Sequence, residues 1–149
     1  MTMARGERTR MAKSEAHLAL SRLDDPRRQE ARKKARTADP EATARQAAHA
    51  AQEKKATEVV LIDLRKHSSY ADFLVVCSGT NERQLEAIAD AVEKSLRESG
   101  NTPIGTEGAR GGRWVLLDFG DVVIHVFSEE ERAYYDLEGL WSDAPVERL

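Results

Sequence analysis

The sequence predicts an α/β domain in which helices flank both faces of a mixed β-sheet. Short apolar runs rich in β-favouring residues alternate with helical segments, and this alternation is typical of an α/β sheet. Two of the runs, at 114–117 and 122–127, are apolar on both faces, which is typical of inner strands covered on two sides. A turn signal separates them, so we expect them to pair as a hairpin within the sheet.

The first half of the domain is expected to hold a helix and two strands. Residues 41–56 are Ala-rich with Gln and Lys, a composition that favours a helix. The apolar, β-branched run at 59–64 predicts the first strand, and residues 72–77 predict a second, buried strand. Cys77 ends this second run and is expected to be a small core residue.

A second helix is expected to follow, with Asn81 as its N-cap and Gln84 at the capping-box position. Gly100 should end this helix, since Pro103 lies just beyond it. Residues 103–106 are interpreted as a short strand. The apolar residues of the helix recur with a period of 3.6 and should form one stripe against the sheet: Leu85, Ile88, Ala89, Val92 and Leu96.

The hairpin turn falls within residues 118–121. A three-residue loop of Asp118, Phe119 and Gly120 requires a positive φ only at the glycine, whereas a two-residue loop of Phe119 and Gly120 would impose it on a bulky side chain. We therefore expect the longer loop, with Leu117 paired to Asp121. In that register one face carries Val115, Leu117, Val123 and His125, and the other carries Trp114, Leu116, Val122, Ile124 and Val126.

The last helix is expected to begin after Ser128, because a glutamate three residues on completes a capping box, and to end at Gly139. Three of its residues have the i, i+3, i+7 spacing of a buried stripe: Tyr134, Leu137 and Trp141. Tyr135 falls to one side of this stripe, so Tyr135 and Trp114 are expected to be the more exposed aromatic residues. For the tyrosine and the tryptophan of the stripe, burial in the core and exposure for binding both stay open.

The charge of the chain is divided unevenly. Residues 1–55 carry 14 Lys+Arg against 8 Asp+Glu, whereas residues 56–149 carry 9 against 18. A length of 149 residues allows one domain and a tail. We therefore predict a basic N-terminal arm over residues 1–41, disordered or helical, and the domain proper over residues 42–149.

The arm is expected to contribute little to the core. Its apolar cluster at 17–23 is too small to bury much, and basic residues follow at 27–36. Such basic runs also suit contact with RNA phosphates, which is an alternative role for the arm. Translation from Met3 or Met11 is a third alternative, in which part of the arm would be absent from the protein.

The cysteine count and hydropathy indicate a cytoplasmic protein. A single cysteine cannot form a disulfide within the chain, which suits a reducing compartment. No apolar run approaches the roughly 20 residues that a membrane span needs. The N-terminal residues lack the apolar segment of a secretory signal. We therefore expect no membrane partner.

Few residues are candidates for catalysis. The segment 78–80, Ser-Gly-Thr, lies between a strand and a helix N-terminus, where backbone N–H groups can hold an anion, although such residues usually only form the turn and cap. Asp63, Asp72 and Asp118 stand singly near strand ends, where carboxylates cap turns. His125 is expected to be a hydrogen-bonded structural residue, because four scattered histidines give no metal-ligand spacing. We expect no catalytic residue, metal or cofactor.

Several motifs together resemble those of the ribosome silencing factor (Iojap-like) family, over about residues 55–143. They are Asp63-Leu64, the run from Asp72 to Thr80, Trp114 followed by Asp118, Gly120-Asp121, His125-Val126, and Tyr135-Asp136-Leu137-Glu138-x-Leu140-Trp141. The resemblance implies a nucleotidyltransferase-like fold that is catalytically degenerate. Those enzymes need Gly-Ser at the turn and two carboxylates one residue apart on the next strand, to hold two metal ions. This chain has Ser-Gly at the turn, and no expected strand carries such a pair.

The resemblance also implies a function and a binding surface. Members of the family bind the large-subunit ribosomal protein numbered fourteen, on the face where the ribosomal subunits meet. This contact blocks subunit joining and represses translation when nutrients run low. Carried over position by position, the partner-binding residues are Trp114, Tyr135, Leu137, Leu140 and Trp141. A basic ribosomal protein also suits the acidic charge of the domain.

A different class of function competes with this interpretation. The alternative is a nucleotide-binding or nucleotidyl-transferring α/β enzyme that uses Ser78, Gly79 and the single carboxylates. The long basic arm departs from the family pattern, and a contact of this arm with ribosomal RNA also stays open. So does a homodimer, since inner strands with an apolar helix face could support one.

Overall fold

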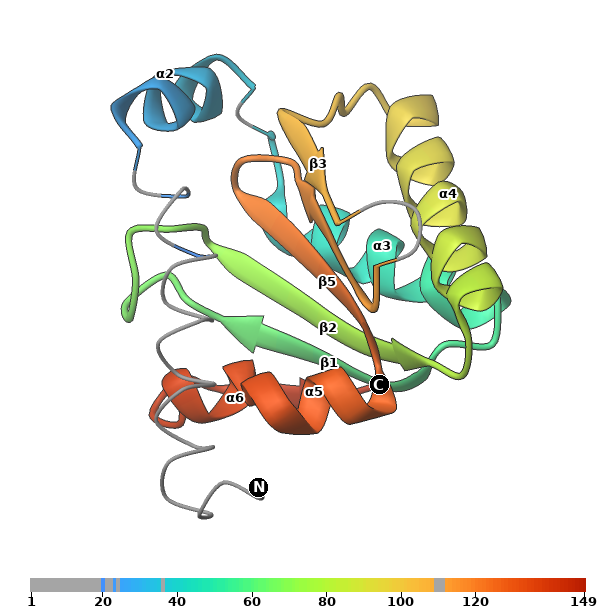
Figure 1. The fold of residues 1–149 in the computed structure, drawn as a ribbon. Coiled ribbons are helices and arrows are strands. Elements are labelled where there is room, and N and C mark those ends of the chain that lie inside the picture. The colour runs from blue at the N-terminus through green and yellow to red at the C-terminus, as the bar shows by residue number, and fades with distance from the viewer. Residues whose placement is uncertain (1–19, 21–22, 24, 36, 109–111) are drawn as a thin grey trace.

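The computed structural model describes residues 20, 23, 25–35, 37–108 and 112–149. From Pro40 onward the helices and strands follow the predicted order, except that the last helix is divided in two and a strand is added at the C-terminus (Figure 1). The elements are α2 (Pro26–Lys34), α3 (Pro40–Glu53), β1 (Thr57–Asp63), β2 (Phe73–Gly79), α4 (Glu82–Glu98), β3 (Gly105–Glu107), β4 (Trp114–Asp118), β5 (Val122–Ser128), α5 (Glu129–Tyr135), α6 (Leu137–Leu140) and β6 (Val146–Arg148).

The strands form one six-stranded sheet in the order β3-β4-β5-β2-β1-β6. The central pair, β2 and β5, is parallel, and the other neighbouring strands are antiparallel. This arrangement confirms the predicted mixed sheet. Strand β6 was not expected, because its three residues are all exposed and show no apolar pattern.

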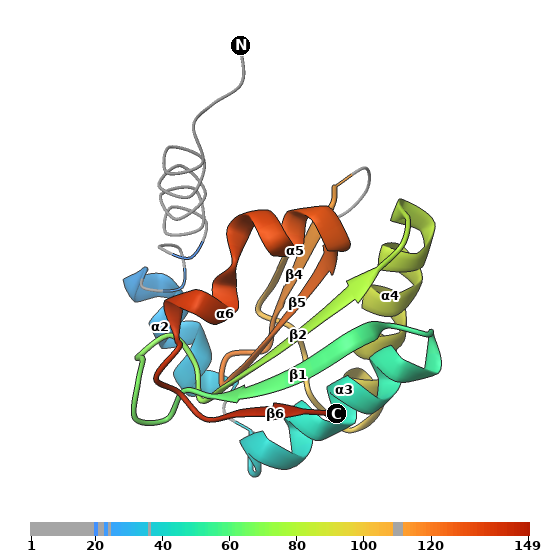
Figure 2. The same cartoon turned by 90° about the horizontal axis from the view of Figure 1, so that it is seen from below.

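Helices cover both faces of the sheet, as predicted. Helices α3 and α4 lie on one face, and α5 and α6 lie on the other (Figure 2). The predicted stripe of α4 is confirmed, since its buried residues are the five named above. Helix α3 turns small alanine side chains to the sheet, which allows its backbone to approach closely: Ala44, Ala47, Ala48 and Ala51.

The predicted register of the hairpin is wrong. Leu117 pairs with Ile124 instead of Asp121, and the Phe119 N–H donates to the Val122 carbonyl at 2.9 Å. The loop is therefore Gly120-Asp121, with Gly120 at φ +86° in the first position, as a type II′ turn requires. The positive φ falls on the expected glycine, but the loop begins there instead of ending there.

The shift in register reverses the facing of β5 relative to β4. Pairing moves by three residues, and an odd shift exchanges the two faces of a strand. His125 and Phe127 consequently lie on the same face as Trp114 and Leu116. The opposite face, against α3 and α4, carries Val115, Leu117, Val122, Ile124 and Val126.

The expectation of one continuous C-terminal helix is also wrong. Helix α5 ends at Tyr135, because Asp136 adopts the left-handed conformation with φ +46°. The Asp136 side chain then accepts the N–H of Gly139 and caps α6. Tyr134 and Tyr135 are both half-buried, and Tyr135, expected to lie off the buried stripe, is the one that packs against the apolar cluster of this face.

The N-terminal segment contributes to the core more than predicted. Leu20 and Leu23 are 1 % and 4 % exposed and join the apolar cluster on the face covered by α6. Helix α2 begins at Pro26, with the Asp25 side chain accepting the Arg27 N–H as a cap. The expectation that this segment buries little is therefore wrong for its described residues. Residues 1–19, with Met3 and Met11, lie outside the described residues.

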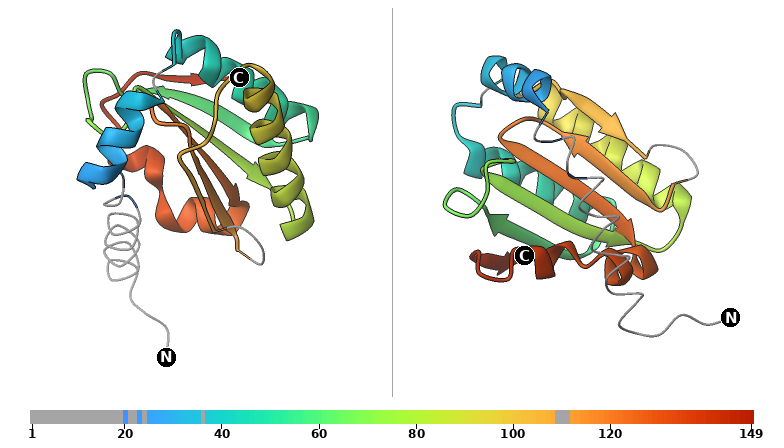
Figure 3. Two further views of the ribbon diagram at one scale, coloured as in Figure 1. Left: turned by 90° about the horizontal axis from the view of Figure 1, so that it is seen from above. Right: turned by 60° about the vertical axis from the view of Figure 1, so that its left-hand side comes forward.

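Helix α2 lies beside the β4–β5 turn (Figure 3), and a buried arginine, Arg28, joins the two. The Arg28 guanidinium donates to both carboxylate oxygens of Asp118, at 2.9 and 2.8 Å. It also donates to the backbone carbonyls of Leu23, Tyr70 and Gly120. The charge of Arg28 is thus neutralised and all its donor groups are used, as a buried ion pair requires.

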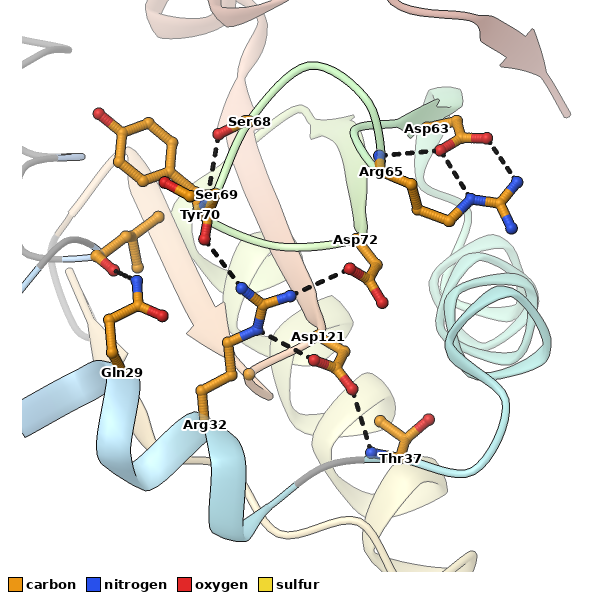
Figure 4. A network of polar contacts seen from close by, with 12 residues as sticks. Gln29, Arg32, Thr37, Asp63, Arg65, Ser68, Ser69, Tyr70, Asp72 and Asp121 are labelled. Atoms are coloured by element: carbon orange, nitrogen blue, oxygen red, sulfur yellow. Dashed lines mark hydrogen bonds and ion pairs between the residues drawn. The ribbon is translucent and has the colours of Figure 1, made fainter.

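A second arginine extends this connection to the loop before β2. The Arg32 guanidinium lies between Asp72 and Asp121, 3.0 Å from each carboxylate (Figure 4). It also donates to the Ser69 carbonyl. Two arginines of the basic run therefore bind this chain's own carboxylates. These two side chains are engaged within the chain, whereas Arg27 is 95 % exposed, and contact of the arm with RNA stays a prediction.

Candidate functional site

Three aromatic side chains form a cluster at the end of the sheet where α5 begins. Trp114 opens β4, and Phe127 faces it across the strand pair. Their ring centroids are 4.8 Å apart with the planes nearly stacked. Tyr135, the last residue of α5, places its ring 4.6 Å from that of Trp114. Trp114 and Tyr135 are both half-buried, so part of each ring faces solvent.

A histidine lies beneath this cluster. The indole N–H of Trp114 donates to Nδ1 of His125 at 3.0 Å. His125 is fully buried, and this burial lowers its pKa to about 3, so the imidazole is neutral at physiological pH. The prediction of a hydrogen-bonded structural histidine is confirmed.

The five predicted partner-binding residues divide into two groups. Leu137 and Trp141 are buried in the apolar cluster of this sheet face, and Trp141 also packs edge-on against Tyr70. Trp114 and Tyr135 contact each other at the surface, and Leu140 is 37 % exposed on α6. We use the name aromatic surface for the contacting rings of Trp114 and Tyr135, together with the exposed Leu140 on the next helix along the chain. The buried pair supports this surface from below.

The supporting residues were partly missed by sequence reasoning. Phe127 was expected in a strand but not beneath the surface, because the wrong hairpin register separated it from Trp114. Tyr70 lies outside any periodic segment, so no sequence signal pointed to it.

Acidic side chains form the first turn of the helix that carries Tyr135. The first turn of α5 consists of Glu129, Glu130 and Glu131, after the Ser128 cap. Arg132, 11 % exposed at its side chain, anchors the helix by donating to Glu138. Beside Trp114 the exposed Arg113 pairs with Glu130, so Glu129 and Glu131 leave the charge near the aromatic surface mainly negative, which favours a basic partner.

The segment that could hold an anion is used for packing and capping. Ser78 is buried and accepts a hydrogen bond from Arg132 at 2.9 Å. A Cβ on Gly79 would lie 2.8 Å from Leu85, so close strand–helix packing explains this glycine. The Thr80 N–H and hydroxyl both donate to the Gln84 side chain. A cleft of about 420 Å³ opens beside this segment, lined by Arg113 and several glutamates.

The single aspartates do not come near that cleft. Ser78 is paired with Phe127, whereas Asp63 and Asp118 pair at the opposite end of the same sheet. There they cap turns as predicted, since Asp63 accepts the N–H of Arg65 and Asp118 accepts the N–H of the turn glycine. The parts that the enzyme alternative requires are thus separated by the length of a strand.

The described part of the chain offers little for other chemistry. Within it, no group of three or more His, Cys, Asp or Glu side chains is placed to hold a metal ion. Cys77 is a core residue, as predicted, and burial raises the pKa of its thiol to about 12. None of the described helices has the length and apolar character needed to cross a lipid bilayer.

The fold and this surface define a small mixed-sheet α/β protein whose candidate site is aromatic and suited to binding. A family model described as ribosomal silencing factor during starvation matches residues 37–149. The chain belongs to this family, which confirms the resemblance noted in the sequence. Translation regulation is the class of function that this membership supports.

Individual relatives agree with the family assignment. The chain is 47 % identical over 103 residues to the ribosomal silencing factor RsfS of Halalkalibacterium halodurans, a match covering 69 % of this chain and 88 % of that protein. A crystal structure of a protein from Chromobacterium violaceum has a TM-score of 0.68 at 36 % identity, and the match covers 70 % of this chain and 87 % of that one. A mouse relative, mitochondrial assembly of ribosomal large subunit protein 1, is 31 % identical over 93 residues, which cover 60 % of this chain and 41 % of that protein.

Proposed function

We propose that this protein silences ribosomes by binding a basic protein of the large ribosomal subunit through its aromatic surface. The family resemblance implies that this partner is the large-subunit protein numbered fourteen, at the face where the subunits meet. A protein docked there obstructs subunit joining sterically and represses translation in the cytoplasm. The protein acts by binding and carries out no reaction in this role.

The observation that carries the proposal is the contact between the rings of Trp114 and Tyr135 at the surface of this chain, which belongs to the silencing factor family. Tryptophan and tyrosine are enriched among residues whose truncation weakens protein binding most. Buried neighbours hold both rings, so little ordering is required when a partner binds. The glutamates at the start of α5 add attraction for a basic partner.

The proposal is tested by capture from a cell lysate and by sucrose gradients. The tagged protein is expected to retain large subunits and to exclude joined ribosomes. Added to purified subunits, it should lower the yield of joined ribosomes in proportion to its binding. Capture of joined ribosomes and free large subunits with equal efficiency would contradict the steric mechanism.

A matched pair of leucine variants tests the surface itself. Leu140→Glu replaces an exposed apolar side chain on the aromatic surface, whereas Leu149→Glu makes the same change at a site of similar exposure (43 %) at the C-terminus. We expect Leu140→Glu to weaken large-subunit binding by tenfold or more and Leu149→Glu to leave it unchanged. Equal affinities for the two variants would place the interface elsewhere.

The enzyme alternative is tested by calorimetry with ATP, CTP and Mg²⁺. The separation of Ser78 from the aspartates, and the ion pairs of Asp118 and Asp72 with arginines, argue against it. We expect no heat of binding at micromolar concentrations.

The homodimer stays a prediction, and light scattering over a range of concentrations tests it.

A further inference from the structure

The orientation of Trp114 is determined from three sides. Phe127 stacks on its ring, Tyr135 packs against it, and His125 accepts its indole N–H at 3.0 Å. Stacking contacts alone leave a ring free to slide and rotate in its plane. The hydrogen bond removes this freedom, because it requires one edge of the indole to face the imidazole.

The hydrogen bond also defines the state of the histidine. Nδ1 accepts, so the ring proton must be on Nε2, and a protonated imidazole could not take part. Nε2 is buried and has no hydrogen-bond partner among the described residues. His125 is a buried polar residue, and among the described residues its ring makes one hydrogen bond, to an indole at the surface. Core packing alone explains such a residue poorly, since an apolar side chain would fill that space without the loss of hydration.

We propose that His125 is a positioning residue that holds Trp114 in the orientation in which it binds the partner. This inference rests on the proposed function and identifies what sets the geometry of its surface. A rigid aromatic side chain contributes more affinity because less freedom is lost when the partner binds.

The proposal also restricts the chemistry of the partner's contact. The indole N–H is the only hydrogen-bond donor of a tryptophan side chain, and His125 occupies it. The partner therefore meets ring carbon atoms, which suit apolar groups and the cationic side chains of a basic protein. A hydrogen-bond acceptor of the partner finds no donor on this ring.

Two substitutions of the histidine separate positioning from packing. His125→Asn retains an acceptor oxygen close to the place of Nδ1, whereas His125→Leu retains bulk without an acceptor. Hydrogen exchange of the Trp114 indole N–H, followed by NMR, should be slow in the native protein and in His125→Asn and at least tenfold faster in His125→Leu. Indole exchange that is equally slow in all three proteins would overturn the proposal.

Affinity for large subunits is measured on the same proteins. We expect His125→Leu to weaken binding roughly tenfold, because the partner must then order the freed Trp114 side chain when it binds. His125→Asn should bind nearly as well as the native protein. Trp114→Phe keeps an aromatic ring but removes the N–H. On this background His125→Leu should weaken binding no further, because the bond it breaks is already absent.

Additive losses in the double variant would mean that His125 supports the fold in general and would overturn positioning. The positioning role would also be overturned if His125→Leu showed fast exchange of the Trp114 indole N–H but bound large subunits with unchanged affinity. Failure of the proposed function gives a different result, in which Trp114→Ala leaves the binding of large subunits unaltered.

Discussion

Replacing Arg28 with alanine should destabilise the protein strongly, although the residue precedes the region that defines the family. The change leaves the Asp118 carboxylate, 5 % exposed, without its cation, and it removes the arginine donors from the carbonyl groups of Leu23, Tyr70 and Gly120. Breaking a buried ion pair from one side typically costs about 3–5 kcal/mol. For a chain of this size, each kcal/mol lowers the melting temperature by about 2–4 °C, so a decrease of roughly 10 °C is expected.

Urea and thermal denaturation, followed by circular dichroism, measure this effect. Arg27→Ala is the matched control, because that side chain is exposed and its loss should change the free energy of unfolding by less than about 0.5 kcal/mol. The double variant Arg28→Met with Asp118→Asn should recover much of the loss, since it leaves no buried charge and keeps an acceptor for the turn N–H. A loss below about 1 kcal/mol in Arg28→Ala would refute the reasoning and show that α2 is not docked in solution.

Three further predictions concern the turn glycine, the break between α5 and α6, and the buried histidine. Gly120→Ala should cost about 1–2 kcal/mol in urea denaturation, because φ is +86° there, whereas Gly105→Ala, with open space around it, should cost less than about 1 kcal/mol. Asp136→Asn should be nearly neutral, since asparagine tolerates the left-handed conformation and can cap α6, but Asp136→Val should cost about 2 kcal/mol or more. Burial lowers the pKa of His125 to about 3 in the folded protein, so its imidazole is neutral there at any higher pH. In the unfolded chain the same imidazole gains a proton below about pH 6.5. Its contribution to stability is therefore complete above pH 6.5 and is lost as the pH falls, by about 1.4 kcal/mol per unit, so the curve of unfolding free energy against pH should be flatter in His125→Leu.

Local patterns predicted the helices and strands well. The apolar stripe of α4 and the cap at Asn81 depend on residues within a few positions of each other, and both are confirmed. The hairpin register was not predictable in this way. Gly120 satisfies the positive φ in either loop, and the apolar residues of β4 and β5 fill both faces, so no polar face identified the correct pairing.

Prediction of the candidate site depended on the family resemblance more than on periodicity. Helical spacing, which assumed one continuous helix, placed Tyr135 away from the core. The structure breaks that helix at Asp136 and shows the Tyr135 ring against Trp114. The arginine contacts of α2 could not be predicted, since a run of basic residues does not indicate which distant carboxylates it meets. The boundary between arm and domain at residue 41 stays a prediction, although Arg28 and Arg32 now join α2 to the domain.

The contacts of α2 impose an order on folding during synthesis. Asp118, which neutralises Arg28, lies 90 residues further along the chain, and the Tyr70 carbonyl lies 42 residues further. While a nascent chain emerges, α2 leaves the exit tunnel long before the hairpin that receives it exists. Its arginines therefore stay hydrated through most of translation, and α2 can dock only after the β4–β5 turn has formed. The first described helix of this protein is thus among the last elements to reach its place, which delays completion of the native state until nearly the whole chain has been made.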